Sequence, residues 1–325
     1  MVALAFTALA AFGQTKLTFE VASVKPAAPL DMTKMAAQIQ QGQMPKIGAH
    51  IENGRAEYTY MALRELIVMA YGVKPYQLTG PDWLANQRFD IVAKMPEGSK
   101  KDDAKVMLQS LLEERFKLQV HHETKEHPAL ALVVGKGGPK LKESEGKPAP
   151  IDESVPLKPG EMSTESGEGP IRMTVGKDGS ASVDMGMKGK MHYHVDPATM
   201  TLHLDATQST MEGFADMLTN FSQIGGTGNK VVVDMTELKG YYDVSIEFSL
   251  AELLAMARAA GMDVPAAAGG LTGSNPNAQL AASDPSGASS SVYSAVSSLG
   301  LKLEPRKLPL DQLIIDHCEK TATEN

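Results

Sequence analysis

Cysteine, the residue that forms disulfide cross-links, is almost absent from the chain. Cys318 is the single cysteine among 325 residues, so no disulfide can form within the chain and packing must hold the fold together. A catalytic cysteine needs a histidine partner placed by the fold, and adjacent His317 would point to the opposite face of a strand. We therefore interpret Cys318 as an ordinary thiol near the C-terminus.

Positive charge is also scarce. The chain has 31 Lys and Arg residues against 39 Asp and Glu residues, which gives a formal net charge of -8. Nucleic-acid binding needs a concentrated basic face to neutralise phosphates, and the sequence contains no such cluster. This pattern excludes nucleic acid as the expected partner.

Long hydrophobic runs are absent from the mature chain. A transmembrane helix needs roughly 18 consecutive apolar residues, and no stretch of that length occurs. The opening run from Val2 to Phe12 is shorter and matches the apolar core of a secretory signal. The sequence predicts a signal peptide over residues 1–14 and a mature start between Gln14 and Leu17. A buried N-terminal strand or helix is the alternative, and the exact cleavage site and true start codon stay open.

Two stretches of the chain, 55–134 and 203–315, share an order of apolar patterns. Both contain apolar residues at helical spacing, and the two sets correspond: Leu63, Leu66, Ile67 and Ala70 with Met211, Phe214, Ala215 and Leu218. Both stretches also follow a hairpin signal, at Asn53-Gly54 and at Asp196-Pro197. The sequence predicts an α+β fold of two repeated β-α-β-β-α-β-β units with long flexible insertions, and coincidence is the alternative.

This interpretation divides the mature chain into two α+β units. The first unit is expected over 17–138 and the second over 191–320. Residues 139–190 are rich in Gly, Pro, Glu, Lys and Ser and predict a flexible, loop-rich linker. A second flexible insertion is expected over 264–290, which is small, polar and punctuated by Gly and Pro.

Several ordered blocks resemble those of a known family. They are "FEVASVKP", "ALRELIVMAYGV", "LTGPDWLANQRFDIVAK", "MLQSLLEERFKLQVHHETKE", "LALVVGKGGPKLKES", "VVVDMTELKGYYDVSIEF" and "LGLKLEPRKLPLDQLIIDHCEK". Together they look like the uncharacterised soil-associated family of exported bacterial proteins. The resemblance implies an extracytoplasmic location and supplies no biochemical activity. Each half is also similar in element order to the short N-terminal domain of secretins and TonB-dependent receptors, which implies a docking role.

Histidines are the first candidates for chemistry. His192 and His194 alternate along one predicted strand, and His203 follows on the next, so their imidazoles could meet on one face of a hairpin. Three imidazoles would suit Zn²⁺ or Cu²⁺. A polar outward face of the strand explains the alternation equally well, so no metal site is assigned. The run "HHETKEH" over 121–127 is interpreted as the charged tip of a hairpin.

Two acids occupy corresponding positions in the two stretches. Asp90 lies within Phe89-Asp90-Ile91, and Asp243 within Tyr242-Asp243-Val244. Each should point away from the apolar face of its strand, toward solvent or a backbone donor, unless the fold pairs the two carboxylates for catalysis. Trp83 is expected to fill a gap between a helix and the sheet, or alternatively to anchor a binding surface.

These observations favour an exported, non-enzymatic module for binding, docking or sensing, located in the periplasm or secreted. A secreted hydrolase, metal-dependent through His192, His194 and His203, is the alternative. No catalytic, cofactor-binding or metal-binding residues are assigned, and no cofactor is expected. An envelope protein, a peptide or a glycan is the expected kind of partner, bound at a sheet edge or between the units. The sequence leaves the ligand, any catalytic activity and the oligomeric state open.

Overall fold

The computed structural model describes residues 16–31, 34, 46–158, 160–176, 178–223, 230–251 and 285–323. The predicted signal peptide, residues 1–14, lies outside the described residues. So does most of the predicted insertion, over 264–284. Its last residues, 285–290, form the beginning of a helix.

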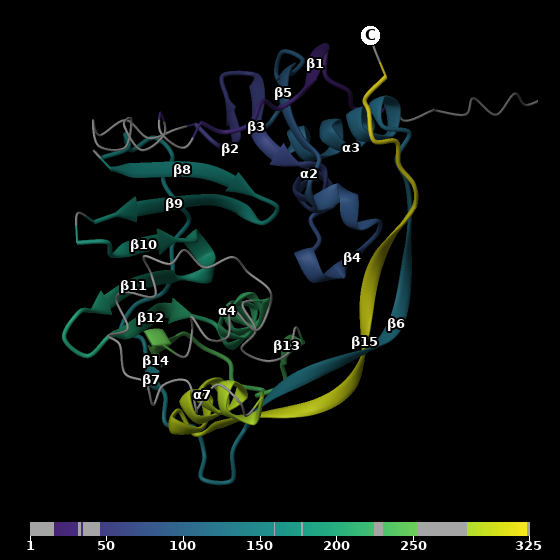
Figure 1. The fold of residues 1–325 in the computed structure, drawn as a ribbon. Helices are drawn as coiled ribbons and strands as arrows, with labels where there is room; N and C mark the ends of the chain where they lie inside the picture. Colours follow the sequence, from purple (N-terminus) through teal and green to yellow (C-terminus); the bar gives the residue numbers. More distant parts are fainter. Residues whose placement is uncertain are drawn as a thin grey trace, which may run out of the picture.

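Eleven strands form one large antiparallel sheet (Figure 1) in the order β1-β5-β3-β2-β8-β9-β10-β11-β12-β14-β7. The strands are β1 (Val21–Pro26), β2 (Gly48–Glu52), β3 (Arg55–Ala62), β5 (Arg88–Lys94), β7 (Lys142–Glu143), β8 (Glu161–Ser166), β9 (Gly169–Val175), β10 (Ala181–Asp184), β11 (Lys190–Asp196), β12 (Thr201–Ser209) and β14 (Tyr242–Ser249). The predicted hairpin turns join β2 to β3 at Asn53-Gly54 and β11 to β12 after Asp196. Positive φ angles of 51° and 73° at Asn53 and Gly54 explain why these two residue types occupy the first turn.

A second sheet has four strands in the order β13-β6-β15-β4. Its members are β4 (Leu78–Thr79), β6 (Gln119–Val134), β13 (Val231–Asp234) and β15 (Leu301–His317). The long strands β6 and β15 pair antiparallel from Leu301↔Val134 to His317↔Gln119. Figure 1 shows this ribbon running from the neighbourhood of α3 to that of α7, on the side of the molecule opposite β8 to β11.

Four α-helices and three short 3-10 helices complete the described fold. They are α2 (Leu63–Tyr71), α3 (Asp103–Arg115), α4 (Met211–Gln223), α7 (Pro285–Ser298), η1 (Pro75–Gln77), η2 (Asp82–Ala85) and η3 (Gly186–Lys188). Helix α2 begins where the Glu65 carboxylate accepts a hydrogen bond from the Ala62 backbone N–H at 2.8 Å. It ends at Gly72, whose left-handed φ of 62° favours glycine. None of the helices described by the structure is long and apolar enough to cross a membrane.

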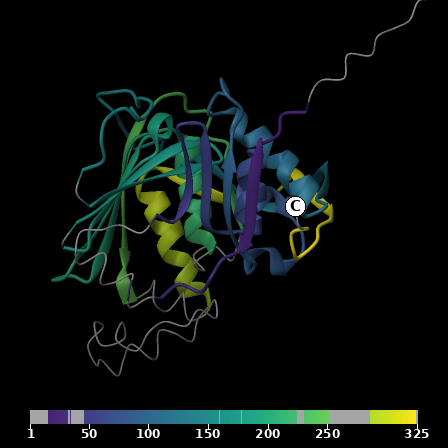
Figure 2. The ribbon, with the colours of Figure 1, turned by 90° about the horizontal axis from the view of Figure 1, so that it is seen from above.

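Two large hydrophobic cores lie between these elements, and a small third cluster contains Met95, Ala104 and Met107. The first contains the predicted apolar face of α2, with Leu63, Leu66 and Ile67 fully buried. The second contains the predicted face of α4, including Met211, Phe214 and Ala215. In the view from above (Figure 2), α4 and α7 lie beside the teal and green strands of the large sheet, with which they are in contact. The buried faces of α2 and α4 were therefore correctly predicted from the spacing of their apolar residues. Each fully buried large apolar side chain contributes roughly 1.5–3 kcal/mol to folding.

The predicted fold class is wrong. Among the described residues, strands take up 44% and helices 21%, so the fold is mostly β and is not an α+β pair of repeated units. The four-stranded sheet mixes strands from both proposed units: β13 pairs with β6, and β4 pairs with β15. The long strands contribute to both cores, since Leu132 and Leu303 lie in the second core while Leu313 lies in the first. The sequence pattern predicts local elements, but it does not show that strands of the two proposed units pair with each other.

Two loop predictions are also wrong. The stretch 139–190 was expected to be loop-rich, yet it supplies β7, β8, β9 and β10 to the large sheet. Hydrogen bonds to neighbouring strands order a segment whose own side chains bury little surface. The run over 121–127 is no hairpin tip, because it forms part of β6 and pairs with β15 along its whole length. His122 lies opposite Leu313 there, and its Nδ1 lies 3.0 Å from an Asp311 oxygen.

Candidate functional site

The structure brings the three predicted histidines together on one face of β11 and β12. His194 pairs with His203 across the strands, and their rings stack with centroids 4.5 Å apart and planes inclined by 4°. The ring of His192 lies 5.5 Å from that of His194. The outer members have other partners: His192 Nδ1 lies 2.9 Å from Ser182 Oγ, and His203 Nδ1 lies 3.3 Å from a Glu247 oxygen.

This stacking does not suit a shared metal ion. An imidazole binds a metal in the plane of its ring at roughly 2.0–2.1 Å, and two parallel planes of stacked rings have no such point in common. Within the described residues, no group of three or more His, Cys, Asp or Glu side chains could hold a metal ion. The histidine row is therefore a weak basis for a metal-dependent activity.

Asp90 and Asp243 are backbone-binding residues in the structure. Asp90 Oδ1 accepts a hydrogen bond from the Tyr60 N–H at 2.8 Å, and Asp243 Oδ1 accepts one from the Gln208 N–H at 3.2 Å. Both donors have positive φ angles and lie at bulges of β3 and β12. Each carboxylate thus satisfies an amide that the bulge removes from the strand ladder.

Trp83 and Cys318 have structural surroundings. Trp83 is partly buried in η2 against the first core, and Lys320 Nζ lies 5.6 Å from the centre of its ring. This placement agrees with the gap-filling interpretation. Cys318 is a free thiol packed against the same core, and burial raises its pKa to about 11, with a further contribution from Glu319.

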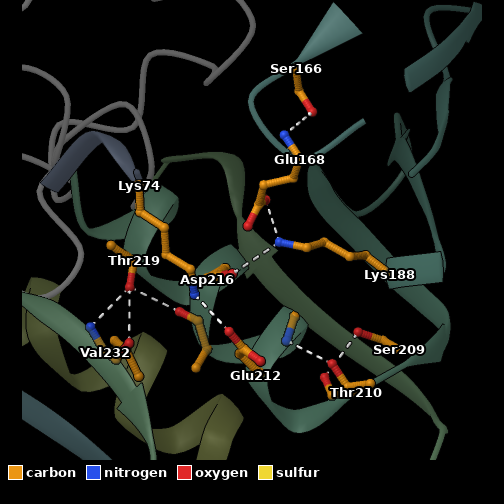
Figure 3. A network of polar contacts seen from close by, with 12 residues as sticks. Lys74, Ser166, Glu168, Lys188, Ser209, Thr210, Glu212, Asp216, Thr219 and Val232 are labelled. Carbon is orange, nitrogen blue, oxygen red and sulfur yellow. Dashed lines mark hydrogen bonds and ion pairs between the residues drawn. The ribbon is translucent and has the colours of Figure 1, made fainter. Parts of the chain in front are cut away.

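A pocket of about 330 Å³ lies where three distant parts of the chain meet. The turn after α2 lines the pocket with Lys74, Pro75 and Tyr76. The β8–β9 hairpin contributes Ser166, Glu168, Gly169, Pro170 and Ile171. The region of η3, β11 and α4 contributes Met185, Lys188, Met191, Gly213, Asp216, Met217, Thr219 and Asn220. Figure 3 shows the charged residues at this junction as one connected network. We call it the ion-pair pocket, defined by Lys74, Glu168, Lys188 and Asp216.

Lys74 is placed by the local sequence around it. Gly72 ends α2, and Pro75 is the first residue of η1, so the chain turns sharply at Lys74. The Lys74 backbone N–H donates to Gln77 Oε1 at 2.8 Å, which fixes the turn. From there Lys74 Nζ lies 2.8 Å from Asp216 Oδ1 and 3.0 Å from Glu212 Oε1.

Helix α4 presents both acids to Lys74. Thr210 caps its N-terminus by accepting a hydrogen bond at Oγ1 from the Gly213 N–H at 3.0 Å. Glu212 and Asp216 then lie one helical turn apart on the face away from the second core. Thr219 anchors the helix to β13, because its Oγ1 accepts from the Val232 N–H at 2.9 Å (Figure 3).

Lys188 joins the network from η3 (Figure 3). Its Nζ contacts a Glu168 oxygen and lies 3.7 Å from Asp216 Oδ2. Gly189 makes this placement possible, because a Cβ at this position would lie 2.6 Å from the Thr207 carbonyl oxygen. Its φ of 95° also lies in the left-handed region that favours glycine.

The electrostatics of the pocket hold Lys74 as an ammonium ion. Burial alone would lower the pKa of Lys74, but hydrogen bonds to Asp216 and Glu212 outweigh it and raise the pKa above its ordinary value. The hydrogen bond to Lys74 lowers the pKa of Glu212. Burial raises the pKa of Asp216, and Lys74 and Lys188 offset this only in part. The raised pKa of Lys74 makes it a poor nucleophile or base at neutral pH. Its two carboxylate partners already neutralise it, so Lys188 is the cation more open to an added anion.

The sequence interpretation missed all four residues of the ion-pair pocket. They lie in the separate stretches Lys74, Glu168, Lys188 and Asp216 and match no catalytic motif. One signal was available: Glu212 and Asp216 are like charges at i and i+4 on the polar side of α4. Such a pair is unfavourable unless a cation from elsewhere lies beside it, and Lys74 is that cation.

The comparison with protein families gives one match, over residues 64–318. The chain belongs to the family described as Protein of unknown function (DUF3738). The match includes every residue of the ion-pair pocket. No curated protein matches the chain, and no solved structure matches it. The family description carries no activity, so function has to be argued from the geometry.

Proposed function

We propose that the protein is a non-enzymatic binding module of the cell envelope. Its ligand is a small molecule with an apolar body and an anionic group, held in the ion-pair pocket. The observation that carries this proposal is the composition of the pocket: lysines from two distant segments converge on Asp216, and apolar side chains make up much of the remaining lining. Its volume of about 330 Å³ lies within the range of roughly 300–1,000 Å³ that is typical of ligand sites.

The anionic group follows from the unequal strength of the ion pairs. Lys74 is held by two carboxylates of one helix and is only 21% exposed. Lys188 instead pairs with Glu168, which lies on the β8–β9 turn and is 45% exposed. Exposed pairs of this kind contribute roughly 0–1 kcal/mol. A ligand carboxylate or sulfonate can therefore replace Glu168 at Lys188 at little cost.

The apolar body follows from the remaining walls. Met185, Met191 and Met217 line the pocket together with Pro170 and Ile171. Methionine side chains are flexible and polarizable and adapt to irregular apolar ligands. The pocket thus favours an amphiphilic ligand over a sugar, which would need many more hydrogen-bonding groups.

Location in the envelope is supported by the apolar run from Val2 to Phe12, which has the length of a secretory signal core. N-terminal sequencing of the protein recovered from the native envelope should give a start between Gln14 and Leu17. Recovery of the chain from the cytosol with Met1 intact would contradict this part of the proposal.

The pocket can be tested with the dye 8-anilinonaphthalene-1-sulfonate, which combines an aromatic body with an anion. We expect saturable binding of one dye per chain by fluorescence titration. Asn220→Trp places a large ring on the exposed side of α4 that lines the pocket, and it should weaken binding at least tenfold. Val195→Trp adds the same ring to an exposed position outside the lining and is the control.

A second pair of variants tests the charge argument. Glu168→Gln frees Lys188 and should strengthen dye binding several-fold, whereas Lys188→Met should weaken it at least fivefold. Equal dye affinity in the Asn220→Trp and Val195→Trp variants would show that the dye binds elsewhere, and the proposed site would be wrong.

A further inference from the structure

The large sheet is nearly divided between β2 and β8. These neighbouring strands are paired at one position only, Ala49↔Glu165. On its other side β2 pairs with β3 over its whole length, and β8 does the same with β9. The antiparallel register of β2 and β8 would place His50 opposite Thr164 and Ile51 opposite Ser163, but neither position is paired. We call the opening between them the strand gap.

The backbone groups of Ile51 and Ser163 point into the strand gap. Asn53-Gly54 is a two-residue turn, so Glu52 and Arg55 form its closing hydrogen-bonded pair. Hydrogen-bonding direction alternates along a strand, which turns the N–H and C=O of Ile51 away from β3. The same argument applies to β8, whose turn is closed by Ser166 and Gly169. It turns the N–H and C=O of Ser163 away from β9, toward β2.

One end of the strand gap is fixed by a side chain. Thr164 Oγ1 accepts a hydrogen bond from the Ala49 N–H at 3.2 Å. It also lies so close to Gly48 that a Cβ there would collide with it. Gly48 has a φ of 100°, which a residue with a side chain rarely adopts. Gly48 and Thr164 thus hold the two strands together beside their single paired position.

The strand gap is a real cavity of about 660 Å³. It is lined from both faces of the sheet, with His50 and Glu57 on one face and Lys101 and Glu165 on the other. The lining contains five carboxylates against three cations, namely Glu52, Glu57, Glu153, Glu161 and Glu165 against Lys46, Arg55 and Lys101. Ion pairs offset part of this charge: Arg55 pairs with Glu57, and Lys101 pairs with Glu153 and Glu165. Arg172, outside the lining, lies 4.0 Å from Glu161, so a small excess of carboxylates remains. The buried Nε2 of His50, which also lines the gap, has no hydrogen-bond partner among the described residues.

We propose that the strand gap binds an extended peptide segment of another protein, which adds as a strand between β2 and β8. Within the described part of the chain, Ile51 and Ser163 have no backbone partner across the gap, and their donors and acceptors match those of a strand, which pairs on its two edges. The excess of carboxylates favours a segment with a basic residue. Ile47, Ile51, Met162 and Met173 provide apolar surface for its alternate side chains. Ile171 lines both this site and the ion-pair pocket, but the two sites use different polar groups, and this proposal does not rest on the ion-pair pocket.

Three labelled peptides of seven residues test the proposal by fluorescence anisotropy. All alternate valine and threonine; the first has a central lysine, the second a central glutamate, and the third repeats the first with alternate backbone amides N-methylated. We expect the lysine peptide to bind at least tenfold more tightly than either of the others. Methylation removes donors from one edge without changing the protein, so this result requires backbone pairing.

Variants of Ser163 place the peptide in the strand gap. Ser163→Pro removes the N–H that points into the gap and spares the β8–β9 ladder, so it should weaken binding of the lysine peptide at least tenfold. Ser163→Ala keeps the N–H and should bind within twofold of the unaltered protein. If Ser163→Pro fails to fold, as judged by circular dichroism, the N-methylated peptide alone decides the question.

Several outcomes would overturn the proposal. One is the absence of binding by the lysine peptide, and another is equal binding of its N-methylated form. A third is loss of peptide binding in the Asn220→Trp variant, which blocks the ion-pair pocket and leaves the strand gap intact. That result would place the peptide in the other site, so the two proposals fail independently.

Discussion

Lys74 Nζ lies 2.8 Å from Asp216 Oδ1, although 142 residues separate them in the chain. The ion pair joins the turn after α2, which packs on the first core, to α4, which packs on the second. The two side chains are 21% and 23% exposed. At this degree of burial, removing one partner costs free energy because the other charge is left buried and unpaired.

We expect Lys74→Met to destabilise the protein by about 2 kcal/mol, because it leaves Asp216 buried beside Glu212 without their shared cation. Asp216→Asn should cost less, since Glu212 remains to pair with Lys74. A double-mutant cycle by urea denaturation should give a coupling energy of about 1–2 kcal/mol. Lys125→Met removes a pair with Glu123 in which both side chains are more than 40% exposed, and this control should change stability by less than about 0.5 kcal/mol.

Gly189 should be more sensitive to substitution than a glycine of similar backbone conformation. Gly189→Ala combines a φ of 95° with a contact of 2.6 Å between the new Cβ and the Thr207 oxygen. We expect a loss of about 3 kcal/mol in thermal or urea denaturation. Gly179 has a φ of 82°, and no atom lies within 4 Å of the position that a Cβ would take there, so Gly179→Ala isolates the backbone strain and should cost about 1 kcal/mol. Equal losses would show that the close approach to β12 is not what places Lys188.

Local features of this fold could be predicted from the sequence, because they depend on neighbouring residues. The spacing of Leu63, Leu66 and Ile67 gave the buried face of α2, and Asn53-Gly54 gave the β2–β3 turn. Asp90 was expected to face solvent or a backbone donor, and it binds the Tyr60 N–H. The helix face and the turn are determined by residues close together in the sequence, and the orientation of Asp90 follows from the alternation of side chains along its strand.

Features that depend on distant segments could not be predicted in this way. Strand β13 pairs with β6, which precedes it by about a hundred residues, and nothing in Val231–Asp234 encodes that partner. The strands β8 to β10 were missed because the stretch as a whole is rich in Gly, Pro, Glu, Lys and Ser, although Ile171, Met173 and Val175 alternate along β9. Pairing with neighbouring backbones orders these strands. The ion-pair pocket belongs to the same class, since its four charged residues come from separate turns and one helix.

The stacked histidines lead to a prediction about stability. His194 Nδ1 is buried without a hydrogen-bond partner among the described residues, whereas His203 Nδ1 faces Glu247. Replacing an unsatisfied polar ring by an apolar side chain removes a desolvation penalty of roughly 1–3 kcal/mol. His194→Leu should therefore leave the free energy of unfolding unchanged or raise it by up to about 1 kcal/mol, and His203→Leu should lower it by about 0.5–1 kcal/mol. A zinc-induced rise in melting temperature that both variants abolish would contradict the argument from parallel rings.

Cys318 should react slowly and in a strongly pH-dependent manner. Burial, with a contribution from Glu319, raises its pKa from 9.0 to about 11, and the thiolate is the reactive form. Alkylation by iodoacetamide at pH 8 should be about a hundredfold slower than for an unstructured cysteine peptide, and the rate should still rise tenfold per pH unit at pH 9.5.

The Cys318 thiol ionises at a lower pH in the unfolded chain than in the folded protein, so its contribution to stability is present below pH 9 and is lost as the pH rises toward 11. Cys318→Ser removes that part of the pH dependence and serves as the control in urea denaturation. A rate that levels off near pH 9 would mean that the thiol is open to solvent and that the C-terminal residues do not pack on the first core as the structure shows.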